Sequence, residues 1–233
     1  MSGPRVVVVT GAAGNLGQAV AAVFAAAGER LALIDVNAEA LAVRYPSAGE
    51  GLMLAPANLL DQESTNRAIQ DVIDRWARVD VLCNLAGGFR MGEPVHETSA
   101  ATWDFLLNIN VGTVLNASRA VVPHMRDRGA GKVINVAAYG ALRGAALMGA
   151  YTASKSAVIR LTEAMSAELR PDGINVNCVL PTTIDTPENR RAMPDADPSQ
   201  WVSPQALADV IAFLASDSAR GVHGAAIPVT GLE

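Results

Sequence analysis

Tyr151 and Lys155 stand four residues apart in the run Tyr-Thr-Ala-Ser-Lys. On a helix, this spacing places the phenol and the ammonium on the same side. A nearby ammonium favours the phenolate, so the pair predicts an acid or a base that works near neutral pH. A plain surface pair is the alternative interpretation.

A glycine-rich turn lies far upstream, between an apolar run and an alanine-rich run. Its glycines have the spacing G-x-x-G-x-x-G, as Gly11, Gly14 and Gly17, with Asn15 and Leu16 before the last one. Glycines let the backbone approach a pyrophosphate closely, and a helix N-terminus offers free amides and the positive end of a dipole. We therefore expect a dinucleotide here, beside the tyrosine and lysine, and hydride transfer coupled to proton transfer. A tight turn that only packs a helix on a strand is the alternative.

Asp35 ends the second apolar run of the chain. A carboxylate at this place accepts hydrogen bonds from the adenosine ribose hydroxyls and repels a 2′-phosphate. The nearest following arginine is Arg44. These residues favour NAD over NADP, the alternative being an ordinary exposed aspartate at a strand end.

Short apolar runs alternate with helical stretches along the whole chain. The continuous β-branched run 6–9 is typical of a strand buried on both faces. We predict strands at 6–9, 31–34, 51–55, 79–84, 132–136, 174–180 and 225–229, and helices at 15–27, 61–77, 99–128, 151–170 and 204–216. This alternation predicts an α/β fold, with a parallel sheet covered by helices on both faces.

The segment 182–203 breaks this pattern, since it is rich in proline and charged residues. A loop of this length inside a compact domain is usually functional. We expect a substrate lid at 182–203, or else a surface excursion, within a single domain that spans 1–233.

Composition narrows the class of protein. Half of the 233 residues are hydrophobic and 18% are charged, and the net charge of −5 argues against binding a nucleic-acid backbone. No apolar run reaches the roughly 18 residues that span a membrane, and no signal peptide is evident, so we expect a cytoplasmic protein without a membrane partner. Cys83 and Cys178 are expected as buried free thiols, and the three widely spaced histidines match no metal site.

With these residues in view, the chain resembles the short-chain dehydrogenase/reductase family. The resemblance covers nearly the whole chain and rests on five motifs in the family's order, at 10–17, 80–87, 110–112, 151–155 and 181–186. It implies a Rossmann-like doubly wound parallel sheet of about seven strands with helices on both faces.

The resemblance also implies roles for residues at matching positions. Tyr151 would be the catalytic acid or base, Lys155 would hold the nicotinamide ribose and lower the tyrosine pKa, and Asn110 would anchor a relay water. The implied cofactor-binding residues are Gly11, Gly14, Asn15, Leu16, Gly17, Asp35, Asn58, Leu59, Asn84, Ala86, Gly87, Tyr151, Lys155, Pro181, Ile184 and Thr186. Among them, Asn84, Ala86 and Gly87 would line the adenosine side of the cofactor.

One departure from the family pattern concerns the substrate. The family usually reads Asn-Ile-Ser-Ser after the fifth strand, whereas this chain reads Asn-Val-Ala-Ala, so Ala138 stands where the second serine would stabilise the substrate oxygen. Loss of one such donor costs about 10²- to 10³-fold in rate. Tyr139 or Arg143 could replace it, or both could point to solvent. We expect the substrate pocket at Ala138, Tyr139, Arg143, Phe89 and Met148.

The sequence thus favours an NAD(H)-dependent oxidoreductase that acts on a small carbonyl or alcohol substrate. Because Ala138 offers no donor, one alternative is a reductase of an activated quinonoid substrate, of the dihydropteridine type. Another is an NAD-binding sensor or scaffold protein with low activity. The resemblance implies a homotetramer or a homodimer, and neither the substrate nor the direction of reaction follows from these residues.

Overall fold

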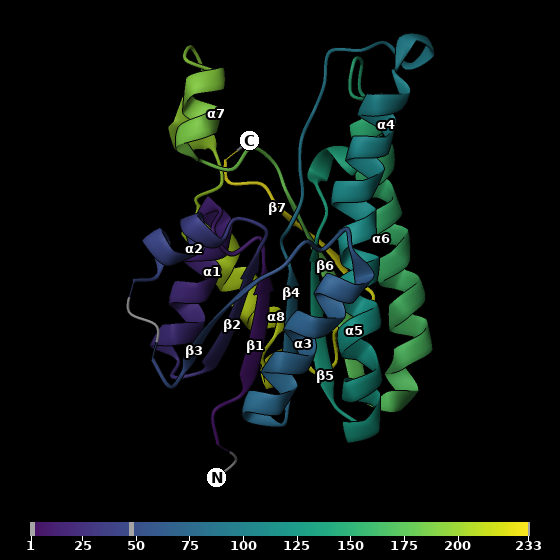
Figure 1. Cartoon of the computed structure of the whole chain (residues 1–233). Coiled ribbons are helices and arrows are strands. Elements are labelled where there is room, and N and C mark those ends of the chain that lie inside the picture. Colours follow the sequence, from purple (N-terminus) through teal and green to yellow (C-terminus); the bar gives the residue numbers. More distant parts are fainter. Residues whose placement is uncertain (1–2, 47–48, 233) are drawn as a thin grey trace.

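A computed structural model describes residues 3–46 and 49–232. Within these residues a single seven-stranded parallel sheet forms the centre of the molecule (Figure 1), in the order β3-β2-β1-β4-β5-β6-β7. The strands are β1 Val6–Thr10, β2 Arg30–Asp35, β3 Leu52–Pro56, β4 Val81–Asn84, β5 Gly131–Val136, β6 Ile174–Pro181 and β7 Ala226–Val229. The predicted doubly wound α/β fold is confirmed.

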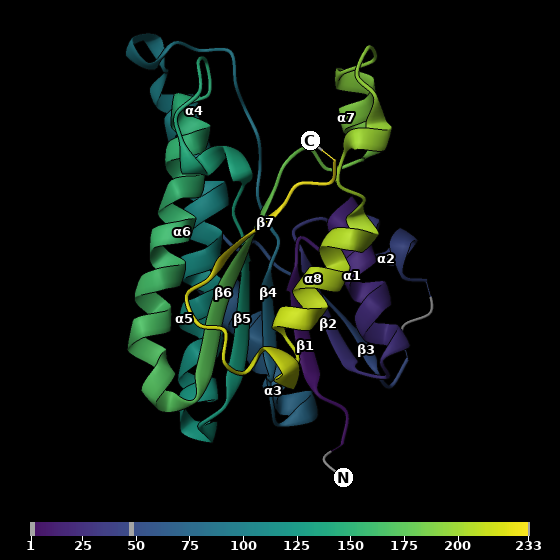
Figure 2. The ribbon, with the colours of Figure 1, turned by 180° about the vertical axis from the view of Figure 1, so that it is seen from behind.

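Helices cover both faces of this sheet. The α-helices are α1 Asn15–Ala26, α2 Ala38–Arg44, α3 Gln62–Trp76, α4 Ala100–Leu107, α5 Thr113–Arg128, α6 Gly149–Leu169, α7 Pro187–Ala192 and α8 Pro204–Leu214. Helices α3, α5 and α6 lie on one face, and the view from behind shows α1 and α8 on the other (Figure 2). The shorter helical segments are η1 Val95–Glu97, the π-helical turn η2 Asn108–Gly112, η3 Tyr139–Leu142, η4 Arg170–Asp172, η5 Pro198–Gln200 and η6 Asp217–Ala219.

The central strand β1 shows why the apolar runs become strands. Successive side chains of a strand point to opposite faces, so a strand covered on both faces needs apolar residues throughout. Val7 belongs to the same buried cluster as Phe24 of α1 and Ile211 of α8. Val8 belongs to the cluster on the other face, with Val121 of α5. The prediction from the valine run is confirmed.

The structure corrects three expectations about helices. The expected helix 99–128 is interrupted by the π-helical turn η2, which separates α4 from α5. Helix α2 was not predicted, because only Leu41 of its seven residues is buried and it carries little apolar periodicity. The segment 182–203 is not an irregular loop, since it contains α7 and η5.

One helical run, 100–128, is long and apolar enough to cross a membrane by length and composition alone. Its α5 part packs on the sheet through Val114, Ala117, Val121 and Met125, which are buried. Core helices of folded domains pass the same test of composition. Cys83 and Cys178 are free and buried, as predicted.

Asp80 fixes the amino end of β4 to its neighbours. Its carboxylate accepts hydrogen bonds from the Arg78 guanidinium at 2.6 and 2.7 Å and from the Val6 amide at 2.7 Å, and Arg128 lies 3.3 Å away. Burial acts to raise the pKa of Asp80, but these hydrogen bonds and charges hold the pKa below its ordinary value. Ionised Asp80 therefore stabilises the fold above the ordinary aspartate pKa of about 4, and this contribution is lost as pH falls through the lower folded-state pKa.

We predict that Asp80→Asn lowers the free energy of unfolding by about 2 kcal/mol at pH 7, because charged hydrogen bonds are lost. The difference from wild type should shrink as pH falls below about 4, where the carboxyl of the unfolded wild-type chain protonates, and it should vanish below the lower folded-state pKa. Urea unfolding at pH 7 and at pH 3 measures both values. Asp74→Asn, on the exposed face of α3, is the matched control, with an expected change within about 0.5 kcal/mol. An equal loss in both variants at pH 7 would contradict the assignment.

Candidate active site

A cavity of about 520 Å³ lies at the carboxyl ends of the central strands. Its walls come from the turn after β1, the end of β2, the segment after β3, the turn after β4, η2 and the segment that leads into α7. The lining residues are Gly11, Gly14, Asn15, Leu16, Gly17, Asp35, Val36, Ala57, Asn58, Leu59, Leu60, Leu85, Ala86, Gly87, Ile109, Thr113, Ile184 and Thr186. In a doubly wound sheet, ligands bind at this edge, where the strand order reverses.

The glycine turn forms one wall and leaves no room for side chains. Gly11 has a φ of +65°, and a Cβ there would lie 3.0 Å from the backbone of Ala86. A Cβ on Gly17 would clash with the carbonyl oxygen of Gly11. Gly14 is the N-cap of α1 and provides no side-chain cap, so no side chain occupies the first-turn amides of the helix. This cradle fits a pyrophosphate.

Thr10 holds the glycine turn against the end of β4. Its Oγ1 accepts hydrogen bonds from the amides of Leu85 at 3.0 Å and Ala86 at 3.1 Å. The turns after β1 and β4 are therefore fixed relative to each other, and both face the cavity.

Asp35, at the end of β2, lines the cavity with both carboxylate oxygens engaged. Oδ2 accepts a hydrogen bond from the Ala13 amide and Oδ1 accepts one from the Asn37 amide, each at 3.1 Å. These bonds hold the carboxylate beside the glycine turn, at the position expected for contact with a ribose.

Lys155 is buried at the carboxyl end of β5. Only 7% of it is exposed, and its Nζ donates a hydrogen bond to the Val136 carbonyl at 2.9 Å. Burial lowers the pKa of Lys155 to about 8 and raises the pKa of Tyr151 to about 12. Burial therefore sets the direction in which the pKa of Tyr151 is shifted, and the lowering of that pKa by the Lys155 ammonium stays a prediction.

Asn110 links three parts of the site. Its Oδ1 accepts from the Gly88 amide at 2.9 Å, and its Nδ2 donates to the Gly88 carbonyl at 3.1 Å and to Ser154 Oγ at 3.0 Å. It stands in the π-helical turn η2, a feature that often marks functional sites. The side chain thus joins η2 to the turn after β4 and to α6.

Gly87 lies between the cavity and the side chains of Lys155 and Asn110. It lines the cavity, and a Cβ there would lie 2.9 Å from Asn110 Oδ1 and 3.2 Å from Lys155 Nζ. The absence of a side chain at Gly87 therefore brings the cavity within contact distance of Lys155 and Asn110.

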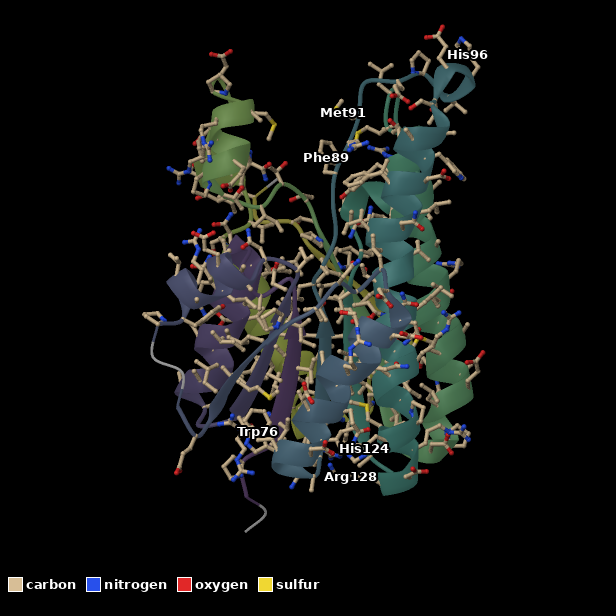
Figure 3. The ribbon with its side chains drawn as sticks, viewed as in Figure 1. Trp76, Phe89, Met91, His96, His124 and Arg128 are labelled. Atoms are coloured by element: carbon tan, nitrogen blue, oxygen red, sulfur yellow. The ribbon has the colours of Figure 1, made fainter. Side chains whose placement is uncertain are left out.

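Of the five residues expected in the substrate pocket, Phe89 contacts Tyr151 and Ala138 is buried. The ring of Phe89 meets that of Tyr151 edge to face, with centroids 4.8 Å apart, and Figure 3 shows Phe89 and Met91 on the segment beyond β4. Ala138 is buried just beyond β5.

Tyr139 and Arg143 are exposed, and within residues 3–46 and 49–232 their side chains make no hydrogen bond or ion pair. Met148 is partly buried and precedes α6. Phe89 thus contacts Tyr151 in the structure. Neither the Tyr139 hydroxyl nor the Arg143 guanidinium forms a hydrogen bond or ion pair with Tyr151 or with the described residues around Ala138.

Of the sixteen residues expected to bind a cofactor, twelve line the cavity. The four that do not are Asn84, Tyr151, Lys155 and Pro181. Asn84 is buried between strands, where its Nδ2 donates to Asn135 Oδ1 at 2.9 Å, so the expectation that it lines the adenosine side is corrected.

Sequence reasoning missed several residues of the site. Val36, Leu60, Ile109 and Thr113 line the cavity, and only their nearness to Asp35, Asn58 and Asn110 in the chain could have indicated them. It also missed a bond across the cavity mouth, from Asn15 Nδ2 to Glu188 Oε2 at 2.7 Å, which ties α7 to the glycine turn.

Within the described ranges, no group of three or more His, Cys, Asp and Glu side chains is arranged to hold a metal ion.

Comparison with known proteins agrees with this geometry. The family model described as short chain dehydrogenase matches residues 5–197. The 2-(R)-hydroxypropyl-CoM dehydrogenase of Xanthobacter autotrophicus (strain ATCC BAA-1158 / Py2) is 32% identical over 97% of each chain. Levodione reductase of Leifsonia aquatica is 31% identical, over 97% of this chain and 93% of that one.

A solved structure of NAD+-bound xylitol dehydrogenase superposes with a TM-score of 0.89 and 27% identity, covering 97% of this chain and 98% of that chain. The matches in sequence and in structure thus span almost the whole chain. The chain therefore belongs to the short-chain dehydrogenase/reductase family of oxidoreductases.

Proposed function

We propose that this protein is an NAD(H)-dependent oxidoreductase that interconverts a small carbonyl compound and its alcohol, with Tyr151 as the acid or base. The observation that carries the proposal is the junction at Gly87, where the glycine-lined cavity comes within contact distance of Lys155 and Asn110. A dinucleotide and a proton donor would meet there. The relatives named as dehydrogenases and reductases support the same class of reaction.

The cavity fits a nicotinamide dinucleotide at both ends. The amides at the start of α1 would hold the pyrophosphate, and Asp35 would accept hydrogen bonds from the adenosine ribose. Ile184 and Thr186 would meet the nicotinamide end, which supplies or accepts the hydride when bound. The fixed carboxylate of Asp35 would repel a 2′-phosphate, which favours NAD, and the similar xylitol dehydrogenase was solved with NAD+.

Tyr151 would transfer the proton at its phenolic oxygen. As a neutral phenol it donates a proton to a carbonyl oxygen during reduction. Lys155, anchored at the Val136 carbonyl, would direct its remaining N–H groups toward the ribose hydroxyls and stabilise the phenolate that forms. The Asn110 side chain is already bonded to Gly88 and Ser154, so a relay water would bind a backbone carbonyl of η2 instead.

Ala138 favours an activated substrate as the second candidate. Ala138, just beyond β5, has no side-chain donor. In the part of the chain that the structure describes, neither Tyr139 nor Arg143 makes a hydrogen bond or ion pair that would hold its side chain beside Ala138. A quinonoid or conjugated acceptor needs less stabilisation of its oxygen than a simple ketone does, so such a substrate would suit this site.

The molecule offers surfaces for self-association. Trp103 on α4 and Phe213 on α8 are large exposed side chains. They would lie in the interfaces of the homodimer or homotetramer that the family resemblance implies.

We predict that Tyr151→Phe lowers NADH-dependent turnover at least about 10²-fold and leaves NADH affinity nearly unchanged, since it removes only the hydroxyl that transfers the proton. Stopped-flow or steady-state NADH oxidation with a panel of ketones, aldehydes and quinonoid acceptors, together with calorimetric titration, measures both quantities. Tyr139→Phe is the matched variant and should turn over like wild type. Wild-type NADH binding without turnover on any acceptor would instead support the sensor or scaffold interpretation.

Ala138→Ser should restore a donor for the substrate oxygen. We expect turnover of simple ketones to rise at least about tenfold, since one such donor typically contributes about 10²- to 10³-fold to the rate. Turnover of quinonoid acceptors should change little. Ala137→Ser, at the neighbouring position that packs in the core, should bring no gain. An equal rate on all acceptors in wild type and Ala138→Ser would show that the oxygen is stabilised by another group.

Asp35→Ser should weaken the preference for NADH. Removing the carboxylate charge would shift the ratio of NADPH to NADH affinity at least about tenfold toward NADPH, since like charges at an interface cost several kcal/mol. Calorimetric titration of both nucleotides measures the ratio. Glu39→Gln on the exposed part of α2 is the control, and a ratio unchanged in Asp35→Ser would contradict the role of Asp35.

A further inference from the structure

A second cavity, of about 380 Å³, lies at the opposite end of the sheet from the active site. It opens beside the amino ends of β5 and β6 and the turn that precedes β7. Figure 3 labels Arg128 at this end of the molecule, near the bottom of α5. None of the residues that line this second cavity lines the first one.

The lining of this cavity is cationic, although the whole chain carries a net charge of −5. Its four basic side chains are Arg5, Lys132, Arg170 and Arg220, against two acids, Asp80 and Asp217. The cavity lining is thus positively charged although the net charge of the chain is negative, and a local positive surface of this kind is typical of an anion-binding site.

Two of these charged groups already have strong partners. Asp80 is paired with Arg78 and Arg128, neither of which lines the cavity. Arg5 is paired with Glu29 at 2.8 Å and donates to the Ala215 carbonyl at 2.6 Å. Asp80 is therefore neutralised by arginines outside the cavity lining, and Arg5 is neutralised by Glu29.

The other basic groups keep free donors. Within residues 3–46 and 49–232, Arg170 makes no side-chain hydrogen bond or ion pair, and Arg220 donates only to the backbone carbonyl of Asp217 at 3.3 Å. Lys132 donates one hydrogen bond, to the side-chain oxygen of Asn175 at 2.6 Å. Asp217 is the one acid left to face these three cations across the cavity.

Burial and the neighbouring charges both act on the pKa values of two groups that line the cavity, His223 and Lys132. Burial, followed by the charges of Arg170 and Lys132, lowers the pKa of His223, which also lines the cavity. Burial likewise lowers the pKa of Lys132, with Asp217 opposing and Arg5 adding to the effect. The charges of Arg170 and Lys132 therefore act together on one side of the cavity, at His223, although burial is the larger cause of the shift.

Asn175 forms part of the wall of the cavity. It is buried, and while its oxygen holds the Lys132 ammonium, its Nδ2 donates to the carbonyls of Arg220 at 3.1 Å and Val222 at 2.9 Å. One amide thus fixes the lysine of β5 and the turn before β7 relative to each other. The Lys132 ammonium is therefore positioned before any ligand arrives.

We propose that this cavity is a binding site for a small phosphate-bearing anion, held by Lys132, Arg170 and Arg220. Guanidinium groups match phosphate oxygens in geometry, and an ammonium adds a point charge. The volume lies near the lower limit for small-molecule sites, so the ligand is a compact one. The proposal does not depend on the reaction at Tyr151.

Calorimetric titration of the full chain with inorganic phosphate, and then with pyrophosphate, tests this site at constant ionic strength. NADH is kept saturating so that the glycine turn, which also fits phosphate, is occupied. We expect saturable binding that weakens at least about tenfold in Arg170→Met and in Lys132→Met. Arg67→Met, on the exposed face of α3, should bind phosphate like wild type.

The NADH affinity of each variant reports whether it is folded, because the two cavities share no lining residue. Arg170 is exposed, so Arg170→Met keeps the test valid if Lys132→Met does not fold. Absence of phosphate binding by wild type would overturn the proposal. Binding that persists unchanged in Arg170→Met and in folded Lys132→Met would also overturn it, because the anion would then lie elsewhere.

Discussion

The buried ammonium of Lys155 is the constraint on which the rest of the active site depends. A charge removed from water needs close oxygen partners, and the Val136 carbonyl at the end of β5 provides the first. Helix α6 must therefore lie against that strand end. Gly87 must lack a side chain, because a Cβ would come within 3.2 Å of Nζ. The remaining N–H donors of the same ammonium would suit the hydroxyl oxygens of the ribose in the proposed cofactor.

The topology of the sheet brings the other parts to the same edge. The chain leaves β1 for the β2–β3 side and returns to β4 on the other side, so the turns after β1 and β4 lie next to each other. Thr10 bonds these turns together, and the cavity opens between them. Parallel strands thus place the glycine turn, Asp35 and Lys155 at one edge, although they are far apart in the sequence.

Patterns that reflect burial and backbone geometry could be predicted from the sequence. The valines of β1 and the glycines of the first turn belong to this class. The valines reflect burial on both faces of the sheet, and the glycines reflect a backbone that leaves no room for a Cβ. Features that arise from tertiary contacts could not be predicted. The π-helical turn η2 carries Asn110, whose side chain is bonded to Gly88, and the raised pKa of Tyr151 reflects burial that residue spacing does not reveal.

A crystal structure of the protein with NADH tests most directly whether the cavity and the acid–base pair form one site. We expect the pyrophosphate at the N-terminus of α1, the adenosine ribose on Asp35, and the nicotinamide ring against Tyr151 with its ribose bonded to Lys155. A cofactor bound outside the cavity, or a nicotinamide directed away from Tyr151, would contradict a tyrosine-dependent oxidoreductase.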